Sequence, residues 1–198
     1  MEPVDAYKAR RRGPRRQPHK VLYIACEGGV TEPRYLRSFE RPGVNIKPAA
    51  GGDPATVVAA ASKAAKKAKD DRAPFDEVWV VFDDDQRPGV ADAITAADKA
   101  KLKVAYSNPC FEIWYLQHCR YSMEWQRTDE AIAELRKYIP RYDKDSDVYN
   151  LLLPKQADAL ANAPRLREEH RANRKKTTDN PSTTVDILVK RLNDLKRR

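Results

Sequence analysis

Short apolar runs alternate along this chain with longer stretches in which apolar side chains recur every three or four residues. The runs are rich in residues that favour β-strands, and they predict strands at 21–25, 44–47, 77–82 and 102–106. The run at 77–82 is nearly continuous apolar sequence, which is typical of a strand covered by helices on both faces. We therefore expect this strand at the centre of a sheet.

Helices are expected between and after these strands. Thr31 can cap a helix over 31–40, and Asp53 can cap a second helix that has Pro54 in its first position. Further helices are predicted at 91–101, 109–119, 128–138, 147–170 with breaks near Pro154 and Pro164, and 182–196. Strands that alternate with helices in this way imply an α/β fold with a mainly parallel central sheet flanked by helices.

The 198 residues are enough for one sizeable core, so we expect a single domain that follows a tail. The domain is predicted over 20–198, with a sheet core over about 20–120 and a helical C-terminal part over about 121–198. Residues 1–19 mix arginine with proline and have almost no large apolar side chains, which predicts a flexible basic arm.

The charge of the chain indicates an anionic partner. Lys and Arg number 38 against 29 Asp and Glu, and the net charge of +9 suits nucleic acid or an acidic membrane surface. No segment is long and apolar enough to span a bilayer, and the basic arm lacks the apolar stretch of an export signal. We therefore expect a cytoplasmic protein that binds nucleic acid rather than membrane. The candidate contacts to nucleic acid are the arginines of the arm: Arg10, Arg11, Arg12, Arg15 and Arg16.

Acidic residues follow two of the predicted strands. In an open α/β sheet, ligands bind beyond the carboxyl ends of the strands, where Glu27 and the triplet from Asp83 to Asp85 are expected. Side chains alternate along an extended backbone, so Asp83 and Asp85 should point one way and Asp84 the other. A solvated turn is the plainer interpretation of the triplet. Its position after the most apolar strand favours a site in which Glu27, Asp83 and Asp85 bind Mg²⁺ or Mn²⁺.

Four further residues are candidates for substrate binding. Asn108 can cap the helix over 109–119, whose first turn could then hold a phosphate, although capping alone would explain Ser107 and Asn108 equally well. Glu112 lies in the same first turn. Lys144 could neutralise charge on a phosphate, with a surface ion pair as the alternative.

Five motifs, in their order and spacing, resemble the RloB family of RloB/AbiL-like bacterial defence proteins: CEG at 26–28 with TEP at 31–33, FDDD at 82–85, SNPCFEIW at 107–114, LLLP at 151–154 and NPSTTV at 180–185. The resemblance implies a Toprim-like fold whose strand-end glutamate and DxD aspartates bind divalent metal, matched here by Glu27, Asp83 and Asp85. It also implies a role in anti-phage or abortive-infection systems beside a separately encoded ATPase of the SMC or OLD type.

These observations together predict a metal-dependent Toprim-type endonuclease. RNA is the preferred substrate by analogy to other Toprim defence effectors, with tRNA as one candidate, and DNA stays open. The alternative is a non-catalytic module that binds nucleic acid or docks a partner, and a homo-oligomer is left open.

Overall fold

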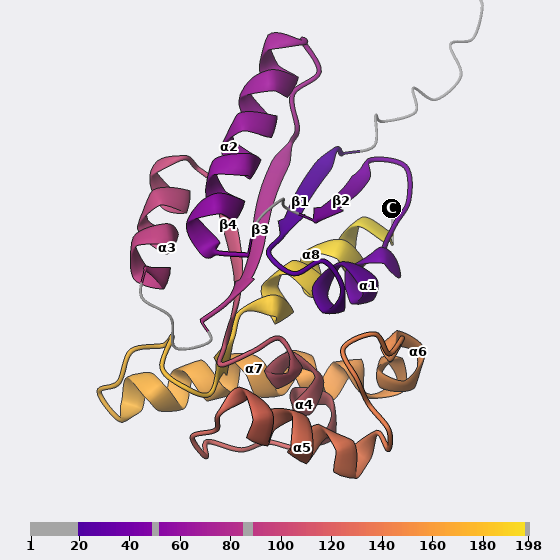
Figure 1. Ribbon diagram of the computed structural model, residues 1–198, viewed down its shortest axis with the longest axis vertical. Coiled ribbons are helices and arrows are strands. Elements are labelled where there is room, and N and C mark those ends of the chain that lie inside the picture. The colour runs from indigo at the N-terminus through magenta and orange to yellow at the C-terminus, as the bar shows by residue number, and fades with distance from the viewer. Residues whose placement is uncertain (1–19, 49–51, 85–88, 197–198) are drawn as a thin grey trace, which may run out of the picture.

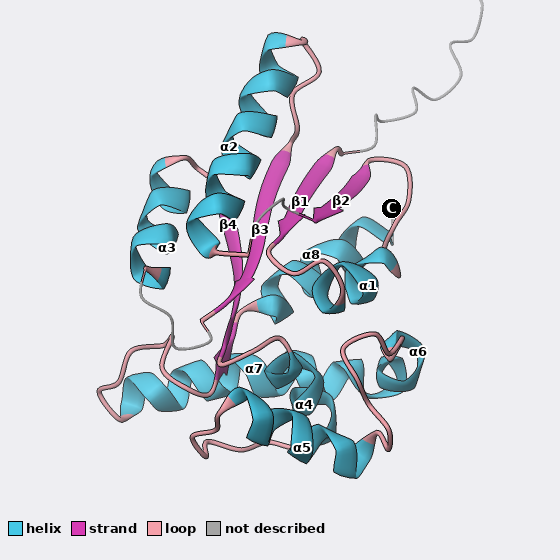
Figure 2. Ribbon diagram, in the orientation of Figure 1, coloured by secondary structure: helices cyan, strands magenta, loops and turns pink. Residues whose placement is uncertain are grey.

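The computed structural model describes residues 20–48, 52–84 and 89–196. Its centre is a five-stranded sheet with the strand order β2-β1-β3-β4-β5 (Figure 1, Figure 2). The first four strands are parallel and the short β5 is antiparallel to β4. The strands are β1 (Leu22–Cys26), β2 (Val44–Pro48), β3 (Glu77–Asp83), β4 (Lys103–Asn108) and β5 (Ser182–Thr183). The expected α/β fold with a mainly parallel sheet is confirmed, and it is Rossmann-like.

Helices form three groups around this sheet (Figure 1). One face is covered by α2 (Pro54–Asp70) and α3 (Val90–Lys99), and the other by α1 (Thr31–Arg37) and α8 (Val185–Lys196). A third group lies beyond the carboxyl ends of the parallel strands and consists of α4 (Glu112–Cys119), α5 (Thr128–Tyr138), α6 (Tyr149–Leu152), the 3₁₀ turn η1 (Leu153–Lys155) and α7 (Gln156–Ala172). The sheet edge therefore faces a layer of helices rather than open solvent.

The central strand β3 contributes to a hydrophobic core on each face of the sheet. Val78, Val80 and Phe82 pack in the core that includes α2 and α3. Trp79 and Val81 point the other way, into the larger core that reaches α1, α8 and the third helical group. Both faces are apolar, which explains the nearly continuous apolar run and confirms that this strand is central.

The start of α2 confirms one predicted cap and the start of α1 corrects another. The Asp53 carboxylate accepts a hydrogen bond from the backbone N–H of Thr56 at 2.9 Å, with a proline in the first turn as predicted. Thr31 is already inside α1, and its hydroxyl donates to the carbonyl oxygen of Lys144 at 3.3 Å instead of capping. The hydroxyl that the local pattern assigned to the helix cap therefore forms its hydrogen bond with a loop far away in the sequence.

Asn108 does not cap α4, so that prediction is wrong. The residue is the last of β4 and pairs with Ser182 of β5, and α4 begins only at Glu112. Long-range pairing therefore outweighs the local capping signal. The ring side chains of this helix are all buried, as its helical spacing indicates: Trp114, Tyr115 and His118, together with Phe111 just before it.

The C-terminal third departs from the sequence pattern in two places. A 3₁₀ turn interrupts the helical stretch at Pro154, but Pro164 lies inside α7, where no break occurs. Ala159, Ala163 and Leu166 are fully buried there, so packing outweighs the local cost of the proline. Residues 182–183 form β5 rather than the start of a helix. A two-residue strand is too short to carry a periodic signal, so the sequence pattern could not reveal it.

Candidate active site

A pocket of about 290 Å³ opens at the carboxyl ends of β1 and β3. It is lined by the segment that follows β1, by the end of β3, by the start of α4, and by residues from the third helical group. Four of its lining side chains carry a carboxyl group: Glu27, Glu32, Asp83 and Glu112. We refer to this cavity as the acidic pocket.

The sheet itself brings Glu27 and Asp83 together. Strands β1 and β3 are parallel neighbours with Cys26 opposite Val81, so the next residues of both strands reach the same edge. The backbone N–H of Asp83 donates a hydrogen bond to Oε2 of Glu27 at 3.2 Å. Two of the three predicted metal ligands therefore share one wall of the pocket.

Side chains alternate at the end of β3 as predicted. Asp83 lines the acidic pocket, whereas the Asp84 carboxylate lies on the other side of the strand. There, Oδ2 of Asp84 accepts hydrogen bonds from the Tyr106 hydroxyl at 2.7 Å and from Nδ2 of Asn108 at 3.1 Å. Asp84 therefore joins β3 to β4, and Asp85 lies outside the described residues.

Glu32 is a pocket carboxylate that sequence reasoning did not single out. It lies in the first turn of α1, is 5% exposed, and accepts a hydrogen bond from the backbone N–H of Gly28 at 3.3 Å. A Cβ atom on Gly28 would lie 2.2 Å from Oε2 of Glu32. The glycine therefore makes room for the second glutamate, and the CEG motif followed by TEP was the signal for it.

Glu112 and Lys144 approach the pocket from the helical layer. The hydroxyl of Tyr142 donates a hydrogen bond to Oε1 of the buried Glu112 at 2.9 Å, which fixes the orientation of that carboxylate. Lys144 is exposed at the pocket, and it is the only Lys or Arg among the described residues that line it. Both predicted candidates thus lie beside Glu27 and Asp83.

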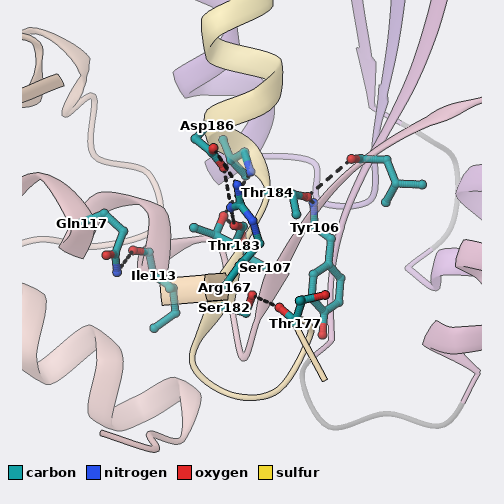
Figure 3. Close-up of polar contacts among 12 residues, drawn as sticks. Tyr106, Ser107, Ile113, Gln117, Arg167, Thr177, Ser182, Thr183, Thr184 and Asp186 are labelled. Carbon is teal, nitrogen blue, oxygen red and sulfur yellow. Dashed lines mark hydrogen bonds and ion pairs between the residues drawn. The ribbon is translucent and has the colours of Figure 1, made fainter. Parts of the chain in front are cut away.

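Ser107 and Asn108 do not line the acidic pocket. The Ser107 hydroxyl is 3.1 Å from the Thr183 hydroxyl, and Nδ2 of Asn108 also donates to the carbonyl oxygen of Thr178 at 2.9 Å. Figure 3 shows Ser107 among the residues that hold β5 beside β4. These two side chains therefore stabilise the edge of the sheet. The arm arginines from Arg10 to Arg16 lie outside the described residues.

Two carboxyl groups of the pocket, those of Asp83 and Glu32, have raised pKa values. Burial, followed by the charges of Glu32 and Glu112, raises the pKa of the Asp83 carboxyl well above its usual range. Burial also raises the pKa of Glu32, with Glu112 and Glu27 adding to the effect. The Oδ1 atom of Asp83 is buried without a hydrogen-bond partner among the described residues. A buried carboxylate oxygen without a hydrogen-bond partner is stabilised when a cation binds beside it.

The donor set fits a hard divalent ion. Within the described ranges, no three acidic, histidine or cysteine side chains are already arranged as a metal centre. The anionic donor groups that line the pocket are nevertheless its four carboxylates, and burial raises the pKa of the softer Cys110 thiol, which favours its uncharged form. Carboxylate oxygens suit Mg²⁺ and Mn²⁺ better than softer metals.

A family model described as RloB-like protein matches residues 22–192. The chain belongs to the RloB-like protein family. The matched range runs from β1 into α8, so in this RloB-like chain every described wall of the acidic pocket lies inside the family match. No curated protein and no solved structure matches the chain. Among its described residues, no helix is long and apolar enough to cross a membrane.

Proposed function

We propose that this chain is a divalent-metal-dependent nuclease of the Toprim type. The observation that carries the proposal is the unpartnered, buried Oδ1 of Asp83 in a pocket that it shares with Glu27, Glu32 and Glu112. Such a cluster is costly without a cation and well suited to hold one. A pocket at the carboxyl ends of parallel strands is also where α/β proteins bind their ligands.

The residues of the pocket have different roles in the proposed reaction. Glu27 and Asp83, joined by Asp85, are the proposed ligands of Mg²⁺ or Mn²⁺, which when bound activates water and neutralises the leaving oxygen. Glu32 and Glu112 supply further carboxylates, and Tyr142 keeps Glu112 in place. The Lys144 ammonium is free to contact a non-bridging phosphate oxygen from the helical side of the pocket.

The substrate class follows from the charge of the chain and from its family. A net charge of +9 favours a polyanion, and we propose RNA, with tRNA as a candidate, cut as part of an anti-phage or abortive-infection response. DNA is the second substrate to test, because no feature of the described residues favours ribose over deoxyribose.

The test is cleavage of labelled RNA and DNA by the purified chain and by four variants: Glu27→Gln, Asp83→Asn, Asp84→Asn and Asp85→Asn. Loss of a metal ligand removes most of a metal-assisted reaction, so we expect activity to fall at least about 100-fold in the first, second and fourth. Asp84→Asn should have a milder effect, because an amide oxygen can still accept a bond from Tyr106. Chelator should abolish cleavage, and added Mg²⁺ or Mn²⁺ should restore it.

Thermal unfolding of the same variants separates folding from catalysis. Asp83→Asn should unfold at the same temperature as the parent or slightly higher, because burial and the neighbouring carboxyl groups disfavour an ionised side chain at this position. Cleavage that survives both Glu27→Gln and Asp83→Asn would falsify the metal site. A chain that binds RNA but never cleaves it would instead be the non-catalytic module that the sequence leaves open.

A separately encoded ATPase is the proposed partner. The proposal rests on family membership and on the lack of a GxxxxGK[ST] phosphate loop in the sequence. We expect the product of a neighbouring gene to co-purify with this chain and to make its cleavage depend on ATP. Full activity and toxicity of this chain alone would count against that partner.

A further inference from the structure

Trp125 is a large aromatic residue outside both hydrophobic cores of the described structure. Its side chain is 58% exposed, in the segment 120–127 that connects α4 to α5 (Figure 1). The other two tryptophans of the chain, Trp79 and Trp114, are buried. Single exposed apolar residues are common on protein surfaces, so exposure alone assigns no role to Trp125.

The residues on both sides of Trp125 are held in place. Glu124 accepts a hydrogen bond from Arg120 at 2.9 Å, which anchors the residue before it. The backbone N–H of Gln126 donates to Oδ1 of Asn180 at 3.1 Å, and Nδ2 of Asn180 donates back to the Gln126 carbonyl oxygen at 2.6 Å. The backbone that carries the indole is therefore held by its neighbours, so little backbone entropy is lost when the side chain binds a ligand.

Trp125 lies close to the acidic pocket along the chain. Thr128, the first residue of α5, lines that pocket and is three residues away. Three residues of fully extended chain span at most about 11 Å between Cα atoms. Between them, the Arg127 side chain is 59% exposed, with Asp129 and Glu130 as its ion-pair partners. The backbone that carries an exposed indole and an exposed guanidinium group thus passes within about 11 Å of Thr128, at the proposed site of phosphodiester cleavage.

We propose that Trp125 stacks on an unpaired base of the nucleic acid whose phosphodiester occupies the acidic pocket. This inference rests on the proposed function and narrows its substrate class to single-stranded segments, such as loops and ends. A base inside a continuous duplex is stacked between its neighbours and offers no free face, whereas an unpaired base can stack on an aromatic side chain. Because every base has such a face, Trp125 adds affinity for single strands without selecting a sequence.

The test measures binding by the full-length chain carrying Asp83→Asn, which prevents cleavage. Fluorescence anisotropy gives the Kd for a short unstructured RNA and for the same RNA annealed to its complement. Removing one stacked base contact should weaken single-strand binding about five- to 100-fold in Trp125→Ala, with much of the affinity kept in Trp125→Phe. Duplex binding should not change. The matched control is Tyr138→Ala, which removes another exposed aromatic side chain at the far end of α5.

A second measurement reports on the ring directly. Since Trp79 and Trp114 are buried, acrylamide quenching of tryptophan fluorescence reports mainly on Trp125, and single-stranded RNA should protect it. A single-strand Kd within about twofold of the parent in Trp125→Ala, or an equal loss in Tyr138→Ala, overturns the inference. Either result leaves the nuclease proposal standing if Glu27→Gln has lost cleavage. If the chain never cleaves RNA but its RNA binding depends on Trp125, the stacking inference is supported and the proposal of a nuclease is excluded.

Discussion

Gly28 decides how closely the Glu32 carboxylate of the acidic pocket can approach the backbone. An added Cβ would lie 2.2 Å from Oε2 of Glu32, closer than any real contact, so one of the two groups must move. The Glu32 carboxylate is the end of a flexible side chain and will move first. We expect Gly28→Ala to cost at most about 1 kcal/mol of stability and to reduce metal-dependent cleavage about tenfold or more, because displaced site groups lose much of their effect.

The neighbouring glycine provides the control for this prediction. A Cβ on Gly29 meets nothing within 4 Å, so Gly29→Ala should keep both stability and cleavage near the parent level. Urea unfolding and RNA cleavage on the two variants give the comparison. Equal activity in Gly28→Ala and Gly29→Ala would show that the position of Glu32 does not matter to the reaction.

At the scale of secondary-structure elements, one buried ion pair joins α7 to α8 and β5. Arg167 donates to both carboxylate oxygens of Asp186, at 2.7 and 2.9 Å, and also to the carbonyl oxygen of Thr183 (Figure 3). Both side chains are about nine-tenths buried. Arg167→Met leaves the Asp186 charge without its partner, and we expect a loss of about 3–5 kcal/mol in the free energy of unfolding in urea.

Two further variants give this prediction its reference points. Arg165→Met breaks the exposed pair with Glu169 on the same helix and should cost less than about 1 kcal/mol. The double variant Arg167→Met with Asp186→Leu removes both buried charges and should recover most of the lost stability. A full loss that persists in the double variant would mean that the bond from Arg167 to Thr183, rather than the ion pair, holds β5.

At the scale of the whole molecule, charge is concentrated at the N-terminal end of the sequence. Residues 1–19 contain Lys8 and five arginines, and they lie outside the described residues. Phosphate contacts by lysine and arginine carry little base information, so deleting 1–19 should weaken binding to RNA and leave the cleavage sites unchanged. The slope of log K against log salt should become shallower by up to about 4 if all six cations contact a single strand. An unchanged slope, measured by salt titration, would exclude the arm from binding.

The sequence by itself determined the features that depend on local periodicity. Strand-forming runs gave the four parallel strands, Asp53 gave the start of α2, and strict alternation separated Asp83 from Asp84. The meeting of Glu27 and Asp83 was also predictable, because parallel neighbouring strands end at the same edge. Each of these inferences needs only a few consecutive residues and the geometry of a strand or a helix.

Only the tertiary structure decided which other groups reach the acidic pocket. Tyr142 meets Glu112 across 30 residues of sequence, and the Thr31 hydroxyl binds a loop 113 residues away rather than capping its helix. Asn108 likewise ends in a strand because β5 pairs with it from the far end of the chain. Capping and helix propensities amount to about 1 kcal/mol per residue, so long-range hydrogen bonds and burial readily override them. No local pattern records which distant partner a side chain will meet once the chain has folded.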